Sequence, residues 1–190
     1  DKPYIEAKVE NNKQGIVSFN DNKVTMKIAT SFISAEQAKK NYDLELAQTT
    51  FTNLQKQTTD EWNTVLNKIQ VKGATDTQKT TLYSNLYRLY MYPTFYGENK
   101  GTNVDPKWIH SDPYSGDMEH PDAKDGVMYY NNGFWDTYRT AWSAYSLLSP
   151  DKESEYLNGL TQHYKDSTWI PRWIAPGGTN SMVGTNQDII

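Results

Sequence analysis

Hydrophobic and polar residues alternate along the first 33 residues of the chain. The stretches YIEAKVE and KVTMKIATSF both show this period of two, which is typical of half-buried β-strands. Two polar stretches, NNKQG and NDNK, supply the turns. Because a few strands are only marginally stable alone, we expect this region to be the tail of an antiparallel sheet whose other strands lie elsewhere or further upstream.

The pattern changes to helical spacing at Ser34. Ser34 is followed three residues later by Gln37, a capping-box pattern that predicts a helix start. A second start is predicted at Thr59–Asp60, and Gly73 is expected to end that helix. These signals predict two helices within residues 34–74.

Further helices are predicted in the second half of the chain, on either side of a long loop. One helix should open at Thr75–Asp76 and run to Pro93, because its apolar residues recur on one face. Residues 94–132 are rich in Gly and Pro, and a connection of this length is usually functional or disordered. Helices resume at about 135–149 and 151–166. Strands followed by helix pairs predict a β domain joined to an all-α domain.

Composition narrows the function without deciding it. The 190 residues carry a net charge of −4 without a basic run, which argues against nucleic acid and anionic membranes as partners. No segment is long and apolar enough to span a bilayer. The absence of Cys excludes disulfides and thiolate metal sites and is compatible with bacterial export. The 14 Tyr and 6 Trp suit either sugar stacking or an amphipathic core.

The first candidate site lies in NNGFWDTYRTAWSAYSLLSP, residues 131–150. Trp135 and Asp136 fall in the first turn of the expected helix, and Arg139 follows three residues after the aspartate, on the same face. A carboxylate is stabilised at a helix N-terminus, so one interpretation is a capping acid with a local ion pair. The other is a pair of hydrogen-bonding groups for sugar hydroxyls beside the Trp135 ring. The spacing alone favours the capping role.

The second candidate site is WIPRWIAPGGTNSMVG, residues 169–184. Arg172, Trp173 and Asn180 lie in this loop, and binding groups are often held on loops. An arginine between two tryptophans is common in sugar clefts, but a rigid packing loop explains the pattern equally well.

Acidic residues and two histidines gather within residues 110–125. Together they could hold a metal, but their spacing matches neither an EF-hand nor a zinc motif, so we interpret the segment as a solvated loop. We also expect Asp188 to be a surface or capping acid and His163, among polar neighbours, to be a surface histidine. The acidic residues and histidines within residues 110–125 are Asp112, Asp117, Glu119, Asp122, Asp125, His110 and His120.

Four segments carry a resemblance to a known family. They are IATSFISAEQAKKNYDLEL, TLYSNLYRLYMYPTFY, YYNNGFWDTYRTAWSAYSLLSP and IPRWIAPGGTNSMVGTNQDII. In this order they resemble glycoside hydrolase family 92, the calcium-dependent exo-acting α-mannosidases. The third contains the family's most recognisable signature, GFWDTYRT, and the resemblance runs from about residue 26 to the end. Four motifs in the right order are far more specific than any one of them.

The resemblance implies a β-sandwich followed by an (α/α)6 barrel. Residues 1–33 would be the end of the sandwich, residues 34–74 a helical linker, and residues 75–190 the N-terminal part of the barrel. It also implies that terminal α-linked mannose is removed with inversion and with help from Ca2+. In this family the catalytic acid, the base and the calcium ligands follow the NSMVGT segment, so we expect no catalytic or metal residue before Ile190.

The resemblance also assigns roles to the two candidate sites. Asp136 would hydrogen-bond sugar hydroxyls, while Trp135 and Arg139 would shape the cleft and orient the sugar. Residues of the second site would add further contacts, namely Arg172, Trp173 and Asn180.

We therefore predict that the chain is part of a secreted or surface-attached bacterial α-mannosidase, with a preference for α-1,2 linkages. Its partners would be mannose-containing glycans and the remainder of its own polypeptide. We expect the isolated 190 residues to be inactive, and to be poorly stable or self-associating. Two alternatives stay open: a non-catalytic carbohydrate-binding or scaffold piece, and another (α/α)6 glycosidase such as a trehalase relative.

Overall fold

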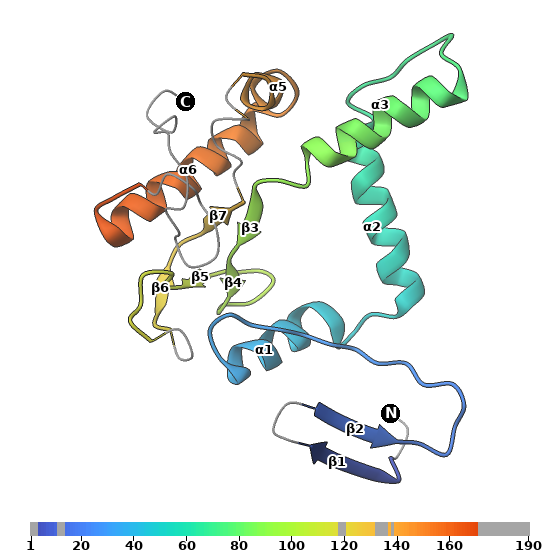
Figure 1. Cartoon of the computed structure of the whole chain (residues 1–190), viewed down its shortest axis with the longest axis vertical. Coiled ribbons are helices and arrows are strands. Elements are labelled where there is room, and N and C mark those ends of the chain that lie inside the picture. The colour runs from blue at the N-terminus through green and yellow to red at the C-terminus, as the bar shows by residue number, and fades with distance from the viewer. Residues whose placement is uncertain (1–3, 11–13, 118–120, 132–136, 138, 171–190) are drawn as a thin grey trace.

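The computed structural model describes residues 4–10, 14–117, 121–131, 137 and 139–170. An N-terminal hairpin lies at one end of the molecule (Figure 1). Two helices, α2 and α3, form one arm, and five short strands with α5 and α6 form the other (Figure 1). This mixture of helices and small antiparallel sheets agrees with the expected β-plus-α composition. The sandwich-and-barrel arrangement and its domain boundaries stay predictions.

The N-terminal hairpin confirms the first predicted strand. Strands β1 (Glu6–Glu10) and β2 (Gln14–Ser18) pair antiparallel. The second predicted strand, KVTMKIATSF, is wrong, because residues 19–33 form neither helix nor strand. Alternation makes a strand only where a neighbouring strand accepts its backbone hydrogen bonds. Here the segment is held by a side chain instead, since Lys27 Nζ donates to the carbonyls of Leu46 (2.7 Å) and Thr49 (2.9 Å).

The helix start at Ser34 is confirmed. Helix α1 (Ala35–Asn41) continues into the π-helical turn η1 (Tyr42–Leu46). The Ser34 hydroxyl accepts from the backbone N–H of Gln37 at 3.1 Å. The Gln37 side chain does not complete the box, since it donates to Asn41 Oδ1 (2.9 Å) and to the Asn99 carbonyl (3.1 Å).

The predicted helix start at Thr59–Asp60 is wrong, because both residues lie inside helix α2 (Phe51–Leu66). The true cap is Thr50, whose hydroxyl accepts from the Asn53 N–H at 3.2 Å. The Thr59 hydroxyl donates to the Gln55 carbonyl one turn earlier (2.8 Å), so it acts within the helix. The helix also ends at Leu66 rather than at Gly73, which occupies the following turn with φ +75°.

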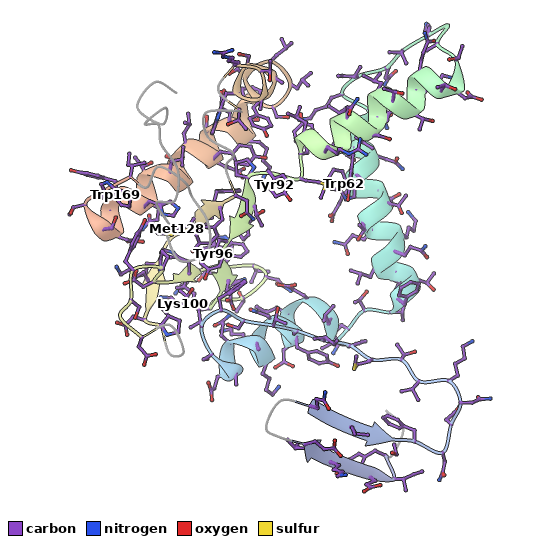
Figure 2. The ribbon with its side chains drawn as sticks, in the orientation of Figure 1. Trp62, Tyr92, Tyr96, Lys100, Met128 and Trp169 are labelled. Atoms are coloured by element: carbon purple, nitrogen blue, oxygen red, sulfur yellow. The ribbon has the colours of Figure 1, made fainter. Side chains whose placement is uncertain are left out.

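Helix α3 (Asp76–Leu89) begins where the sequence predicts. Thr75 and Gln78 form a complete capping box, with the Thr75 N–H donating to Gln78 Oε1 at 2.9 Å. The helix ends four residues before Pro93. The rings of Trp62 and Tyr87, 4.4 Å apart, pack α2 against α3 (Figure 2).

Residues 94–131 contain more secondary structure than the predicted loop. Five strands of two to four residues form two small antiparallel sheets, ordered β3–β7 and β4–β5–β6. Such short strands are too brief to show alternation in the sequence. The strands are β3 (Thr94–Tyr96), β4 (Glu98–Asn99), β5 (Trp108–Ser111), β6 (Ala123–Asp125) and β7 (Met128–Tyr130).

The core lies where β7 meets the last two described helices, α5 (Ala141–Leu148) and α6 (Pro150–Ser167). Tyr96 and Met128, partners across β3 and β7, lie at the centre of this region (Figure 2). A Cβ atom on Gly159 would lie 2.6 Å from Cδ2 of Tyr129, so only glycine lets α6 pack this close to β7. The buried cluster comprises Met128, Tyr129, Tyr130, Trp142, Tyr145, Tyr156 and Leu160. Among the described helices, none combines the length and apolar character needed to cross a bilayer.

Candidate functional site

Most of the predicted sugar-binding residues lie outside the part of the chain that the structure describes. Arg139 is described, and its side chain is exposed in the turn just before α5. The structure therefore neither brings the predicted residues together nor separates them. The residues outside the described ranges are Trp135, Asp136, Arg172, Trp173 and Asn180, together with Asp188.

The structure does describe both flanks of the signature GFWDTYRT. On the N-terminal side, Tyr130 ends β7 with 1% of its surface exposed. Asn131 follows in the left-handed region (φ +57°), and its Nδ2 donates to Thr94 Oγ1 at 3.2 Å. On the C-terminal side, Trp142 and Tyr145 of α5 are buried. The segments on both sides of the signature thus contribute residues to the same aromatic core.

A buried side-chain contact joins β5 to α6. His110 is 1% exposed, and its Nδ1 and Nε2 lie 2.9 Å from the Gly126 carbonyl and 2.8 Å from Asp166 Oδ2. Each ring nitrogen of His110 therefore has a hydrogen-bond partner, one from the backbone and one from a side chain. Asp166 lies 56 residues away in the chain, and no local sequence signal could have paired the two.

The second buried histidine, His163 of α6, is neutral. Its Nε2 donates to the Tyr129 carbonyl at 3.3 Å, and its Nδ1 accepts from the Tyr114 hydroxyl at 2.9 Å. Burial lowers the pKa of His163 to about 4, and the electrostatic influence of nearby His110 acts in the same direction. The hydrogen bond to Tyr129 and the carboxylate of Asp166 oppose this shift only in part.

The predicted surface position of His163 is therefore wrong, since none of its surface is exposed. Its neighbours in sequence are polar, but the neighbours on its helix face are Leu160, Gly159 and Tyr156, all buried. Periodicity along α6, rather than local polarity, was the signal that could have found this position.

The acidic loop is held by lysines and backbone groups, not solvated throughout. Asp112 is 8% exposed, and its Oδ2 lies 2.9 Å from Lys124 Nζ while its Oδ1 accepts from the Tyr114 N–H (2.9 Å). Asp125 pairs with Lys100 at 2.5 Å, and hydrogen bonding to that lysine lowers the pKa of Asp125. Within the described ranges, no three His, Cys, Asp or Glu side chains gather where they could hold a metal. Glu119 and His120 lie outside those ranges.

A cavity of about 320 Å3 lies between residues 28–46 and strands β3 and β4. At the edge of this cavity, the exposed ring of Phe32 packs against the ring of Tyr96, with ring centroids 5.0 Å apart. The Glu98 carboxylate is occupied within the chain, since Oε1 accepts from the Phe32 N–H (2.8 Å) and Oε2 from Asn41 Nδ2 (2.7 Å). These contacts attach residues 30–34 to β4, so this carboxylate serves a structural role.

Comparison with known proteins decides the family. The model of the glycosyl hydrolase family 92 catalytic domain matches residues 37–190. The chain belongs to glycosyl hydrolase family 92. The resemblance drawn from its four motifs is thereby confirmed. No curated protein matches this family 92 chain.

Two solved structures are similar to the family 92 chain. The family GH92 inverting mannosidase from Bacteroides thetaiotaomicron VPI-5482 is 32% identical, with a TM-score of 0.73 over 83% of this chain and 20% of that one. The GH92 family glycosyl hydrolase ccman5 is 20% identical, with a TM-score of 0.51 over 72% of this chain and 17% of its own, and supports the fold alone. The chain thus spans about a fifth of the length of these relatives.

Proposed function

We propose that the family 92 chain is part of a larger glycosidase that removes terminal α-linked mannose, preferably α-1,2-linked, from glycans with inversion. The observation that carries this proposal is the 32% identity to an inverting mannosidase, at a TM-score of 0.73, over 83% of the chain. Because fold alone does not define a substrate, the signature GFWDTYRT adds the local support. We further propose that the enzyme acts outside a bacterial cell or on its surface.

In this proposal, the signature presents the groups that hold the terminal mannose. The Asp136 carboxylate accepts hydrogen bonds from sugar hydroxyls, Trp135 offers an aromatic face, and Arg139 donates. The attachment of β7 and α5 to one core supports this role, because a binding group needs a rigid base. The loop residues Arg172, Trp173 and Asn180 would complete the contacts to the sugar.

The reacting groups are proposed to lie elsewhere in the larger enzyme. An inverting glycosidase uses two carboxyl groups about 6.5–9.5 Å apart, one as acid and one as base, and the family resemblance puts both beyond residue 190. Calcium would be bound by oxygen ligands and could grip mannose hydroxyls. The described residues do not fit such a site, because no three suitable side chains gather within the described ranges.

The test is release of mannose from an α-1,2-linked mannobiose by the full-length enzyme. NMR should detect the β-anomer first, a metal chelator should abolish turnover, and the isolated 190 residues should release none. Asp136→Ala should lower kcat/KM by roughly 10- to 100-fold through the loss of charged hydrogen bonds. Asp76→Ala is the matched control, because Asp76 lies in the first turn of α3, yet it is fully exposed and has no proposed sugar contact.

The outcomes separate the competing interpretations. Equal kcat/KM values for Asp136→Ala and Asp76→Ala would contradict a sugar contact of Asp136 and favour a capping role for this residue. Release of the α-anomer would contradict inversion, and turnover by the isolated chain would contradict the placement of the reacting groups. If the full-length protein binds mannobiose by calorimetry but never cleaves it, a carbohydrate-binding or scaffold role replaces the enzymatic one.

A further inference from the structure

A second cleft, of about 500 Å3, opens between the strands and helix α6. It lies between the side chains of β3, β5 and β7 on one side and one face of α6 on the other. Its volume falls within the range of sites that hold small ligands, about 300–1,000 Å3.

One wall of this cleft consists of three aromatic rings in fixed edge contact. Trp108 packs against Phe95 with ring centroids 5.2 Å apart at 82°, and Phe95 packs against Tyr129 at 5.6 Å and the same angle. Phe95 and Tyr129 are partners across β3 and β7, so the sheet sets the spacing of their rings. Trp108 keeps 40% of its surface exposed and forms the outer end of the row.

The opposite wall is polar and comes from one face of α6. Glu155, Asn158, Gln162 and Lys165 are spaced three or four residues apart, so they follow one side of the helix. Gly159 lies among them, and its lack of a side chain lets Tyr129 pack directly against this face of the helix.

Some of these polar groups are already used, and others are not. The Glu155 carboxylate accepts from Lys152 Nζ (2.6 Å) and from the Tyr129 hydroxyl (3.1 Å). In contrast, the side chains of Asn158 and Lys165 have no hydrogen-bond partner among the described residues. An amide supplies both donors and an acceptor, and an ammonium supplies three donors. These polar groups without partners distinguish the cleft from the cavity beside Glu98, where the carboxylate is hydrogen-bonded within the chain.

We propose that this cleft is a second glycan-binding site, which holds one neutral hexose unit. A hexose has an apolar C–H face that fits the flat ring of Trp108 and a rim of hydroxyls that fits an amide and an ammonium group. A single unpaired lysine, without an arginine fork, favours a neutral sugar over an anionic one. The inference rests on the proposed function only for the identity of the glycan, not for the existence of the cleft.

The test compares binding of a mannan oligosaccharide by calorimetry in four forms of the full-length protein. Trp108→Ala and Asn158→Ala should each weaken binding by about tenfold, as the loss of one good contact does. Tyr164→Ala is the control, because Tyr164 is an exposed aromatic residue of the same helix that does not line the cleft.

Equal oligosaccharide binding by Asn158→Ala, Tyr164→Ala and the unmodified protein would overturn the proposal. Asn158 is exposed, so its replacement leaves the fold intact and gives an answer even if Trp108→Ala does not fold. Failure of the unmodified enzyme to release mannose would refute only the proposed function and leave this comparison valid.

Discussion

The two buried histidines face different atoms. His110 contacts the Gly126 carbonyl and the Asp166 carboxylate. His163 contacts one carbonyl and one hydroxyl, so a neutral ring satisfies both. A buried charge is tolerated when it is paired and hydrogen-bonded, and neither atom that His163 contacts carries a charge.

This difference predicts a pH-dependent loss of stability that is specific to His163. Its pKa is about 4 in the folded chain and 6.5 when unfolded, so the unfolded state binds more protons between these values. The stabilisation is present above pH 6.5 and disappears as the pH falls through 4, with a maximum of roughly 3 kcal/mol. Urea unfolding at a series of pH values should show this decline.

The control for this prediction is His163→Gln. The glutamine amide can still donate to the Tyr129 carbonyl, but it cannot be protonated in this range. The variant should be less stable at neutral pH and should decline less between pH 6.5 and 4. The carboxyl groups titrate alike in both proteins, so their contribution cancels. Parallel curves for the two proteins would show that His163 does not cause the decline.

At the scale of single elements, helix starts are determined within one turn of the chain. The Ser34 and Thr75 hydroxyls each accept from a backbone N–H three residues ahead, and both caps follow from sequence alone. Thr59 shows the limit of such local signals. Its hydroxyl can bond forward as a cap or backward within a helix, and the helix that already begins after Thr50 decides between them.

The capping box of α3 gives a prediction at this scale. Thr75→Ala removes the hydroxyl that accepts from the Gln78 N–H, and should lower the free energy of unfolding by about 1 kcal/mol. Thr81→Ala is the matched control, since Thr81 is exposed in the middle of the same helix, where alanine is neutral or slightly favourable. Denaturant unfolding of both variants measures the difference. A Thr75→Ala protein as stable as Thr81→Ala would show that the box contributes nothing.

At the scale of the whole molecule, the chain leaves an unusual amount of surface uncovered. Its accessible surface is 13441 Å2, whereas a compact monomer of 21.8 kDa exposes about 9,300 Å2. Large apolar side chains contribute to the excess, including Phe51 (75% exposed) and Leu147 (81% exposed). The open arrangement of the two arms in Figure 1 accounts for this surface, because α2 and α3 pack mainly on each other.

This uncovered surface predicts association of the isolated chain. Apolar surface of this extent is removed from water by self-association or by partners. Light scattering should therefore show species larger than 21.8 kDa, and a dye that binds apolar surface should fluoresce strongly. Phe51→Ser together with Leu147→Ser should reduce both signals. A monodisperse monomer without dye binding would show that the exposed side chains are covered in solution.

The sequence by itself determined the family, the caps at Ser34 and Thr75, and the change from a β-hairpin to helices. These features depend on residues within a few positions of one another or on whole motifs in order. Only the tertiary structure decided that residues 19–33 form no strand, that His163 is buried, and that Trp108 faces a polar stripe of α6. Each of these depends on a partner at least 19 residues away in the chain, as in the bonds from Lys27 to Leu46 and from His163 to Tyr129. Strand pairing and burial belong to pairs of segments, and the pattern within one segment does not specify its partner.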